Sequence, residues 1–90
     1  MIAVSEKAKE VLLDWKQSAP ATEVNLTLRL ALSPAGWEVH PDTPRAGDVV
    51  VEYQETPVLI IQERASGLLR EFTLDCRETV ERTRLVLVAN

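Results

Sequence analysis

The chain has 90 residues, of which 46% are hydrophobic and 27% charged, a composition typical of one globular domain over residues 1–90 and not of a disordered chain. Its net charge of −4 argues against a nucleic-acid surface, because phosphate binding needs clustered Lys or Arg whose charge is unopposed. Arginines do crowd the last third, but acids lie among them, which favours a solvated mixed-charge face over a binding patch. These arginines are Arg64, Arg70, Arg77, Arg82 and Arg84.

The sequence also bears on where the protein works. No stretch approaches the roughly 20 apolar residues of a membrane span. The opening MIAVSEKAKE carries charges where a signal peptide would have its apolar core. The single cysteine, Cys76, has no internal disulfide partner, which agrees with a reducing compartment. We therefore expect a cytoplasmic protein with no membrane partner.

The first predicted element is an amphipathic helix that begins after Ser5, a good N-cap residue, and ends near Gln17. Apolar side chains recur at i, i+3, i+4 and i+7, so one stripe is expected to face a core, although the same stripe would suit a partner-binding helix. The stripe consists of Ala8, Val11, Leu12 and Trp15. Pro20 should stop the helix, and residues 18–23 are expected to form a connection.

From Val24 the apolar period changes to two, which predicts a strand with one face on the core and one face exposed or partly covered. The core-facing side chains are expected to be Leu26, Leu28, Leu30 and Leu32. Residues 33–46 contain Gly36 and three prolines, so we expect a long loop with at most a short strand at residues 37–39. A loop of this length in a small domain is often functional.

Residues 47–61 read GDVVVEYQETPVLII and predict a β-hairpin whose turn is formed by Glu55, Thr56 and Pro57. A short helix is expected over residues 63–70 and an alternating strand over residues 72–77. Residues 85–88 are apolar on both faces, which favours a central or covered strand. This order of elements predicts an α+β domain in which an N-terminal helix and a second short helix pack on one small mixed β-sheet.

The order of elements and several local sequences resemble the HesB-like family, the A-type (IscA-like) iron-sulfur cluster carriers. VSEKAKEVL resembles the first helix of that family, and LTLRLAL resembles the strand that leads to its first cysteine loop. Residues 46–76 resemble its central run of acidic turn, hairpin, Ser-containing short helix and Leu-Asp strand. Ala89 and Asn90 lie about where its Asn-Pro-Asn ends the fold. The resemblance implies a HesB-like fold over most of the chain.

Members of that family that carry iron or a cluster use three cysteines, one in a Gly-Cys-Ser-Gly-like loop and two in a Cys-Gly-Cys-like tail. Here the loop reads SPAGW, with Pro34 or Ala35 where the thiolate would lie, and the sequence ends at Asn90 without such a tail. A cluster needs thiolate donors, which proline and alanine lack. The resemblance therefore implies a divergent member with a degenerate metal site, and we expect no bound cofactor.

Cys76 and His40 are the only soft or borderline metal ligands in the chain. Cys76 alternates with Phe72 and Leu74, which favours a buried, inert thiol over a reactive or metal-binding one. His40 lies close to Glu38 and Asp42 in the sequence, which makes it a formal candidate for metal binding. Acidic neighbours of a histidine are, however, common in loops.

Trp37 stands in the loop that would have held a metal ligand, and two interpretations are open for it. Its indole either fills the vacated space as part of the core or serves as an exposed anchor for a protein partner, since Trp often dominates interface energetics. Ser33 and Ser66 have no base at a recognisable motif spacing, so nucleophilic catalysis has no support.

These observations give one main hypothesis and two others. The main hypothesis is a non-enzymatic accessory or protein-interaction module, with a protein partner or a second copy of itself in a homodimer, and with no nucleic-acid partner. The alternative is an atypical iron or iron-sulfur protein that uses Cys76 and/or His40, including Cys76 paired across a dimer. The third hypothesis is an enzyme that uses the Pro-rich loop, and it is supported only by the length of that loop.

Overall fold

The computed structural model describes residues 2–18 and 26–90. Pro20, most of the predicted connection and the predicted strand start at Val24 lie outside the described residues. The fold is α+β, as the sequence predicts. Its elements are β1 (Ala3–Val4), α1 (Glu6–Ser18), β2 (Thr27–Ser33), β3 (Gly36–Asp42), β4 (Asp48–Tyr53), β5 (Thr56–Gln62), α2 (Glu63–Leu68), β6 (Phe72–Glu78) and β7 (Thr83–Ala89).

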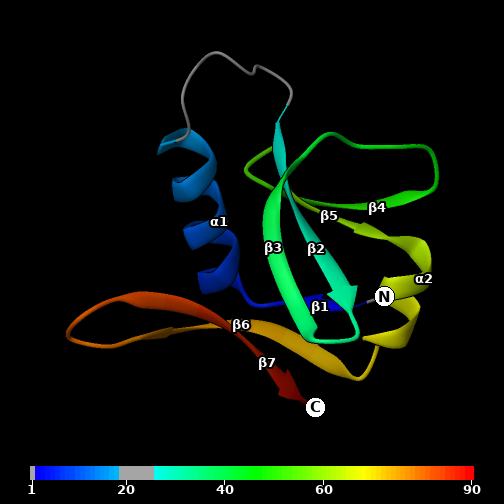
Figure 1. Cartoon of the computed structure of the whole chain (residues 1–90). Coiled ribbons are helices and arrows are strands. Elements are labelled where there is room, and N and C mark those ends of the chain that lie inside the picture. Colours follow the sequence, from blue (N-terminus) through cyan, green and yellow to red (C-terminus); the bar gives the residue numbers. More distant parts are fainter. Residues whose placement is uncertain (1, 19–25) are drawn as a thin grey trace.

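The described strands form two mixed sheets, so the prediction of one sheet is wrong. A four-stranded sheet has the order β3-β2-β5-β4 and a three-stranded sheet has the order β1-β6-β7. Among the strands of the described residues, only β2 with β5 and β1 with β6 run parallel. Helix α1 contacts strands of both sheets, and β6 and β7 run beneath the helix and the larger sheet (Figure 1). The two-residue β1 has no periodicity of its own, and for that reason the sequence does not reveal it.

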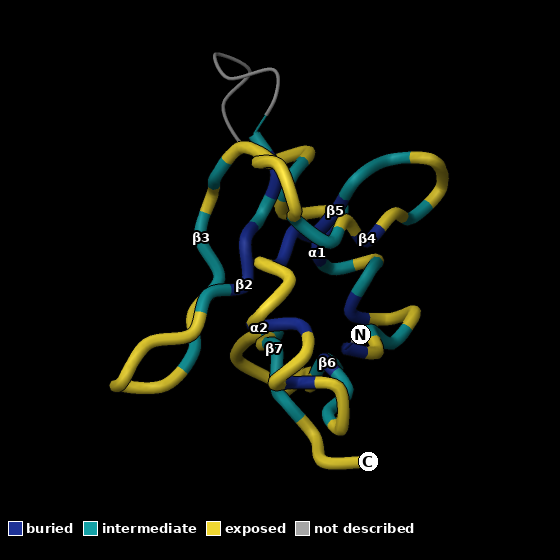
Figure 2. Tube along the Cα trace, turned by 90° about the vertical axis from the view of Figure 1, so that its right-hand side faces the viewer, coloured by how far each residue is buried: buried dark blue, intermediate teal, exposed yellow. Residues whose placement is uncertain are grey.

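The core lies between α1 and the two sheets. It is built from aliphatic side chains that are completely buried, among them Leu12 of α1, Leu30 of β2, Ile61 of β5 and Leu74 of β6. Figure 2 shows that the buried segments of β2 and β5 lie inside the molecule while the hairpin ends are exposed. Full burial of each such side chain stabilises the fold by about 1.5–3 kcal/mol, so these contacts hold the two sheets together.

Helix α1 begins where its sequence predicts. The Ser5 Oγ accepts a hydrogen bond from the backbone N–H of Ala8 (3.2 Å) and donates one to Asp75 Oδ1 (2.7 Å), so one hydroxyl caps the helix and ties it to β6. Ala8 and Leu12 are buried as expected, but Trp15 remains 41% exposed. Helical periodicity gives the direction of a side chain, but it does not tell how far along the helix the covering sheets extend.

Strand β2 differs from the simple alternation expected for it. Leu30 is buried, but Leu32 is 39% exposed because it lies at the end of the strand. On the opposite face Thr27 and Arg29 are buried, and not exposed. That face was expected to be solvated or only partly covered, and the contacts of Arg29 described below explain why it is closed.

The prediction of a long loop at residues 33–46 is wrong as far as Asp42. Strand β3 pairs antiparallel with the whole of β2, from Ser33↔Gly36 to Thr27↔Asp42. Pro41 is accommodated because β3 is an edge strand, where a missing N–H leaves no ladder bond unmade. Prolines exclude a central strand but allow an edge strand, so the prolines of residues 33–46 do not rule out β3.

The predicted hairpin is confirmed as β4 and β5, but its turn is one step earlier than expected. Tyr53 pairs with Thr56, which leaves Gln54 and Glu55 as a two-residue turn. Both have positive φ, 53° and 65°, as in a type I′ turn that matches the twist of the strands. Thr56 and Pro57 already belong to β5.

At the C-terminal end, α2 and β6 are confirmed, whereas β7 is not a central strand. Within the part of the chain that the structure describes, β7 pairs with β6 alone, and Val88 is 40% exposed. Leu85 and Leu87 pack against the core on one face. Apolar residues on both faces make a strand suited to burial on both sides. They do not establish that a second element packs on the outer face.

Candidate functional site

The turn between β2 and β3 is where the resemblance places the first cluster ligand. Ser33, Pro34, Ala35 and Gly36 are all exposed there. The Ser33 Oγ accepts a hydrogen bond from the N–H of Ala35 (3.3 Å) and donates one to the carbonyl of Gly36 (3.5 Å), which closes the turn on itself. The turn presents a hydroxyl and backbone groups but no thiolate, so its residues do not fit an iron-sulfur cluster.

An open groove of about 610 Å³ begins beside the end of β2. Its walls are the end of β2, residues 45–48 and the first residues of α2. Leu32 and Leu68, which are 39% and 66% exposed, give its rim an apolar character. Arg29 and Asp48 also line the groove and form its charged wall. The groove therefore combines exposed aliphatic surface with a charged wall, a combination that suits a protein segment more than a small apolar ligand.

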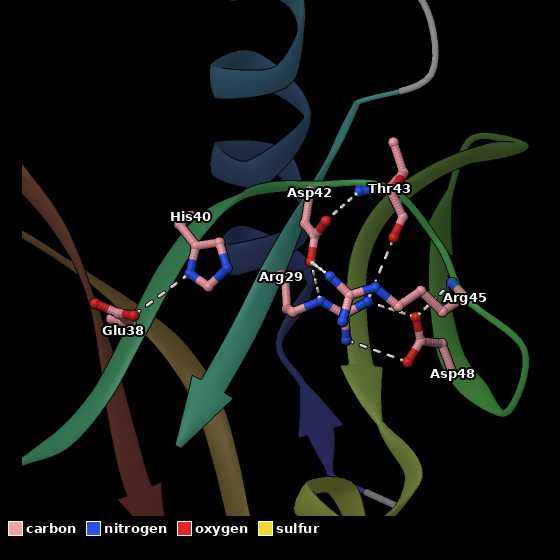
Figure 3. Close-up of polar contacts among 7 residues, drawn as sticks. All are labelled: Arg29, Glu38, His40, Asp42, Thr43, Arg45 and Asp48. Carbon is pink, nitrogen blue, oxygen red and sulfur yellow. Dashed lines mark hydrogen bonds and ion pairs between the residues drawn. The ribbon is translucent and has the colours of Figure 1, made fainter. Parts of the chain in front are cut away.

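A buried ion network builds the charged wall (Figure 3). The guanidinium of Arg29 donates from Nε to Asp42 Oδ2 (2.7 Å) and from Nη1 and Nη2 to the two carboxylate oxygens of Asp48 (3.1 and 2.6 Å). Nη2 also donates to the carbonyl of Thr43 (3.4 Å). The backbone N–H of Arg45 donates to Asp48 Oδ2 (2.7 Å). Residues 42–48 are thus fastened to the face of β2 that would otherwise be open.

The same contacts set the ionisation of the two acids. Hydrogen bonds from Arg29 hold the pKa of Asp48 below its ordinary value, against the opposing effect of burial. For Asp42 the hydrogen bond from the N–H of Thr43 is the largest cause of a lowered pKa, followed by the bond from Arg29. The alternation of LTLRLAL predicts Arg29 on an exposed or partly covered face. The signal that could have found the network is a single arginine within the apolar run LTLRLAL, since a buried charge needs partners.

Trp37 lies on β3 directly opposite Leu32 of β2. Its side chain is partly buried and packs against the hydrophobic core. The indole is therefore partly in the core, which agrees in part with the first interpretation. It lies beside Leu32, which is exposed at the end of the sheet. Its use as a partner anchor stays a prediction.

His40 lies on β3 and is not grouped with both neighbouring acids. Its Nδ1 is 3.5 Å from Glu38 Oε1, and the two side chains are 41% and 68% exposed. Asp42 binds Arg29 and Arg45 instead. Figure 3 shows the imidazole and Glu38 set apart from the Arg29 network. Glu38 and Asp42, the two acids near His40 in the sequence, therefore do not both lie beside its imidazole.

Cys76 lies on β6, in the other sheet from His40, and is partly buried. Burial raises the pKa of its thiol, and the charge of Glu78 adds to that effect. The protonated form, which is a poor nucleophile and metal ligand, is favoured at neutral pH. Across residues 2–18 and 26–90, no three or more His, Cys, Asp or Glu side chains gather where they could hold a metal ion.

The comparisons with known proteins bear on the fold. No protein-family model matches the sequence, and the search of curated proteins found no match. Among solved structures, Escherichia coli SufA, involved in biosynthesis of iron-sulfur clusters, is similar with a TM-score of 0.77 at 12% identity, over 98% of this chain and 84% of SufA. IscA with a [2Fe-2S] cluster is similar with a TM-score of 0.63 at 18% identity, over 99% of this chain and 85% of IscA. The chain therefore has the SufA and IscA fold that the resemblance implied.

None of the helices in the described parts of the chain is long and apolar enough to cross a membrane.

Proposed function

We propose that this chain is a non-catalytic accessory or protein-interaction module of the cytoplasm, built on the fold of SufA and IscA but working without a cluster. One observation carries the proposal: the exposed β2–β3 turn presents Pro34 and Ala35 where the resemblance places a ligand cysteine. Neither side chain has an atom that binds iron. A protein that keeps the fold but lacks these donors acts through its surface.

The groove beside that turn is the surface that best suits a partner. Leu32 and Leu68 expose aliphatic area on its rim, and Trp37 stands opposite Leu32 in the adjoining strand. The wall is held by the hydrogen bonds of Arg29 to Asp48, which favours a surface that needs little ordering when a partner binds. We propose Trp37 and Leu68 as contact residues for a protein partner.

The alternative of an atypical iron site gains little from the geometry. Cys76 has a raised pKa and lies in a different sheet from His40. Binding through Cys76 would require deprotonation of a partly buried thiol and further ligands from a second copy. We therefore place the interaction role first.

Metal analysis tests this choice. The protein is purified from cells grown with added iron, and a portion is also incubated anaerobically with ferrous iron, sulfide and a thiol reductant. We expect far less than stoichiometric iron or zinc after chelation, and the same visible absorption for the natural chain and for Cys76→Ser. Stoichiometric metal would overturn the proposal, and its loss in Cys76→Ser would establish the alternative.

Site-specific photocrosslinking tests the partner surface. A benzophenone side chain at position 68, on the groove rim, should give discrete adducts in the native host. The same group at position 17, on the exposed side of α1, is the matched control and should give none. Sedimentation velocity of the purified chain separates a homodimer from a partner of another sequence. Equal crosslinking from both positions would remove the groove from the proposal.

A further inference from the structure

Three arginines gather at the end of the β6–β7 hairpin. Arg77, Arg82 and Arg84 line a shallow hollow of about 540 Å³ around the turn, together with Thr79, Val80 and Glu81. This end of the hairpin projects past the base of α1, away from the rest of the molecule (Figure 1). The groove described above lies at the other end of the fold and shares none of these residues.

Two of the acids that stand among these arginines in the sequence bind groups outside the hollow, although the charge of Arg77 also contributes to the lowered pKa of Asp75. Glu78 forms an ion pair with Lys7 of α1 (3.2 Å). Asp75 accepts hydrogen bonds from the Ser5 hydroxyl (2.7 Å) and from the N–H of Cys76 (2.8 Å). Within the described residues no ion pair forms at Arg77, Arg82 or Arg84, and Glu81 is the one acid that lines the hollow with them. The surface around the hollow therefore carries more positive than negative charge, although the sequence of this region is mixed.

Two of these arginines also oppose each other directly. Arg77 of β6 is the register partner of Arg84 of β7. Register partners project to the same side of a sheet with Cβ atoms about 5 Å apart, so like charges there are destabilising. The pair costs folding free energy in the free protein, and an anion placed between the two guanidinium groups would offset that cost.

The turn that carries the cluster is fixed and has an apolar tip. The N–H of Thr79 donates to the carbonyl of Arg82 (2.8 Å), and the Thr79 hydroxyl donates to the same carbonyl (3.0 Å). The N–H of Arg82 in turn donates to that hydroxyl (3.2 Å). Val80, at the tip, is fully exposed. A held turn presents an aliphatic side chain between arginines with little loss of conformational freedom on binding.

We propose that the β6–β7 tip binds an acidic segment of a protein partner, with carboxylates at Arg77 and Arg84 and an apolar side chain against Val80. This inference deepens the interaction role proposed above and rests on it. Arginine forks match carboxylates in bidentate geometry, and the exposed Val80 offers an apolar contact that a peptide side chain can use and a phosphate backbone cannot. The net charge of −4 opposes a nucleic acid, whereas a short acidic peptide needs only the local field.

The test is a fluorescence anisotropy titration with a labelled peptide, Asp-Glu-Leu-Asp-Glu-Leu, at low salt. Arg84→Gln should weaken binding about tenfold, the loss of one charged contact of about 1.4 kcal/mol, and Arg84→Glu should weaken it further. Arg70→Gln removes the same charge at an exposed position outside the tip and should leave the affinity unchanged. Val80→Ser should also weaken binding. Arg84→Gln should unfold at the same or a higher urea concentration than the natural chain, because it relieves the opposition to Arg77.

Four results would overturn the inference. They are unchanged affinity in Arg84→Gln, equal binding of the Asn-Gln-Leu-Asn-Gln-Leu peptide, tighter binding of single-stranded oligothymidine than of the acidic peptide, and self-association of the natural chain that Arg84→Gln abolishes. The metal analysis above separates this inference from the proposed function. Stoichiometric iron would remove the accessory role even if the peptide bound, and absence of peptide binding would remove only this surface.

Discussion

The side chains of Arg29 and Asp48 form a two-pronged ion pair across strand β5. Arg29 lies on β2 and Asp48 opens β4, and β5 runs between those strands. Their nitrogen-oxygen distances are 3.1 and 2.6 Å, and the side chains are only 9% and 5% exposed. Ile60, the register partner of Arg29 on β5, is completely buried. The pair therefore fixes residues 43–47 over the sheet and forms one wall of the groove.

Removal of one member of this pair should destabilise the protein strongly. In Asp48→Ala the Arg29 charge stays buried and loses two of its hydrogen bonds. We expect the free energy of unfolding to fall by about 3 kcal/mol, measured by urea denaturation. The matched control is Glu78→Ala, which breaks the exposed Lys7–Glu78 pair and should cost less than about 1 kcal/mol. Equal losses in the two variants would show that the Arg29 network contributes no more than a surface pair.

Acid should weaken the fold through the same carboxylates. The pKa values of Asp42, Asp48 and Asp75 are lowered in the folded protein, so near those values the unfolded chain binds more protons. Their contribution is complete above the unfolded carboxyl pKa of about 3.9 and is lost as the pH falls through the folded pKa values. Urea denaturation of the natural chain and of Asp48→Asn at several pH values checks this. The difference between them should narrow as acid is added, and a constant difference would contradict the account.

The β4–β5 turn offers a stabilising change. Gln54 and Glu55 adopt φ values of 53° and 65°, which cost L-residues roughly 1 kcal/mol or more each. The double change Gln54→Asn and Glu55→Gly supplies the residues that a type I′ turn prefers and should raise the free energy of unfolding by about 1 kcal/mol. Glu52→Gly, within β4, is the control and should lower it, because glycine weakens a strand interior. A loss of stability in the double variant would show that the turn is not under this strain.

Cys76 should react slowly with thiol reagents in the folded protein. Burial and Glu78 raise its pKa, which lowers the thiolate fraction near neutral pH. The rate of reaction with a chromogenic disulfide at pH 8 should be lower in the native protein than in denaturant. Glu78→Gln should increase the native rate, while Glu71→Gln, at the residue just before β6 begins, should not. A native rate equal to the unfolded rate would mean that the thiol is freely accessible.

Contacts between near neighbours in the chain made several elements predictable. Ser5 marks the start of α1 because an N-cap hydroxyl binds an N–H three residues later. The paired apolar arms of residues 47–61 predict the β4–β5 hairpin, and the alternation after Phe72 predicts β6. The SPAGW sequence likewise shows without any structure that the first turn lacks a thiolate. These features depend on spacing along the chain, which the sequence contains in full.

The sequence by itself determined the α+β class, the helix start, the central hairpin and the lack of a thiolate in SPAGW. Only the tertiary structure decided that Arg29 is buried, that β7 is an edge strand and that the arginines of the last hairpin lack ion-pair partners among the described residues. The reason is physical: burial and charge neutralisation depend on distant residues that folding brings close. Asp48 lies 19 positions after Arg29, and Ser5 binds Asp75 from 70 positions away.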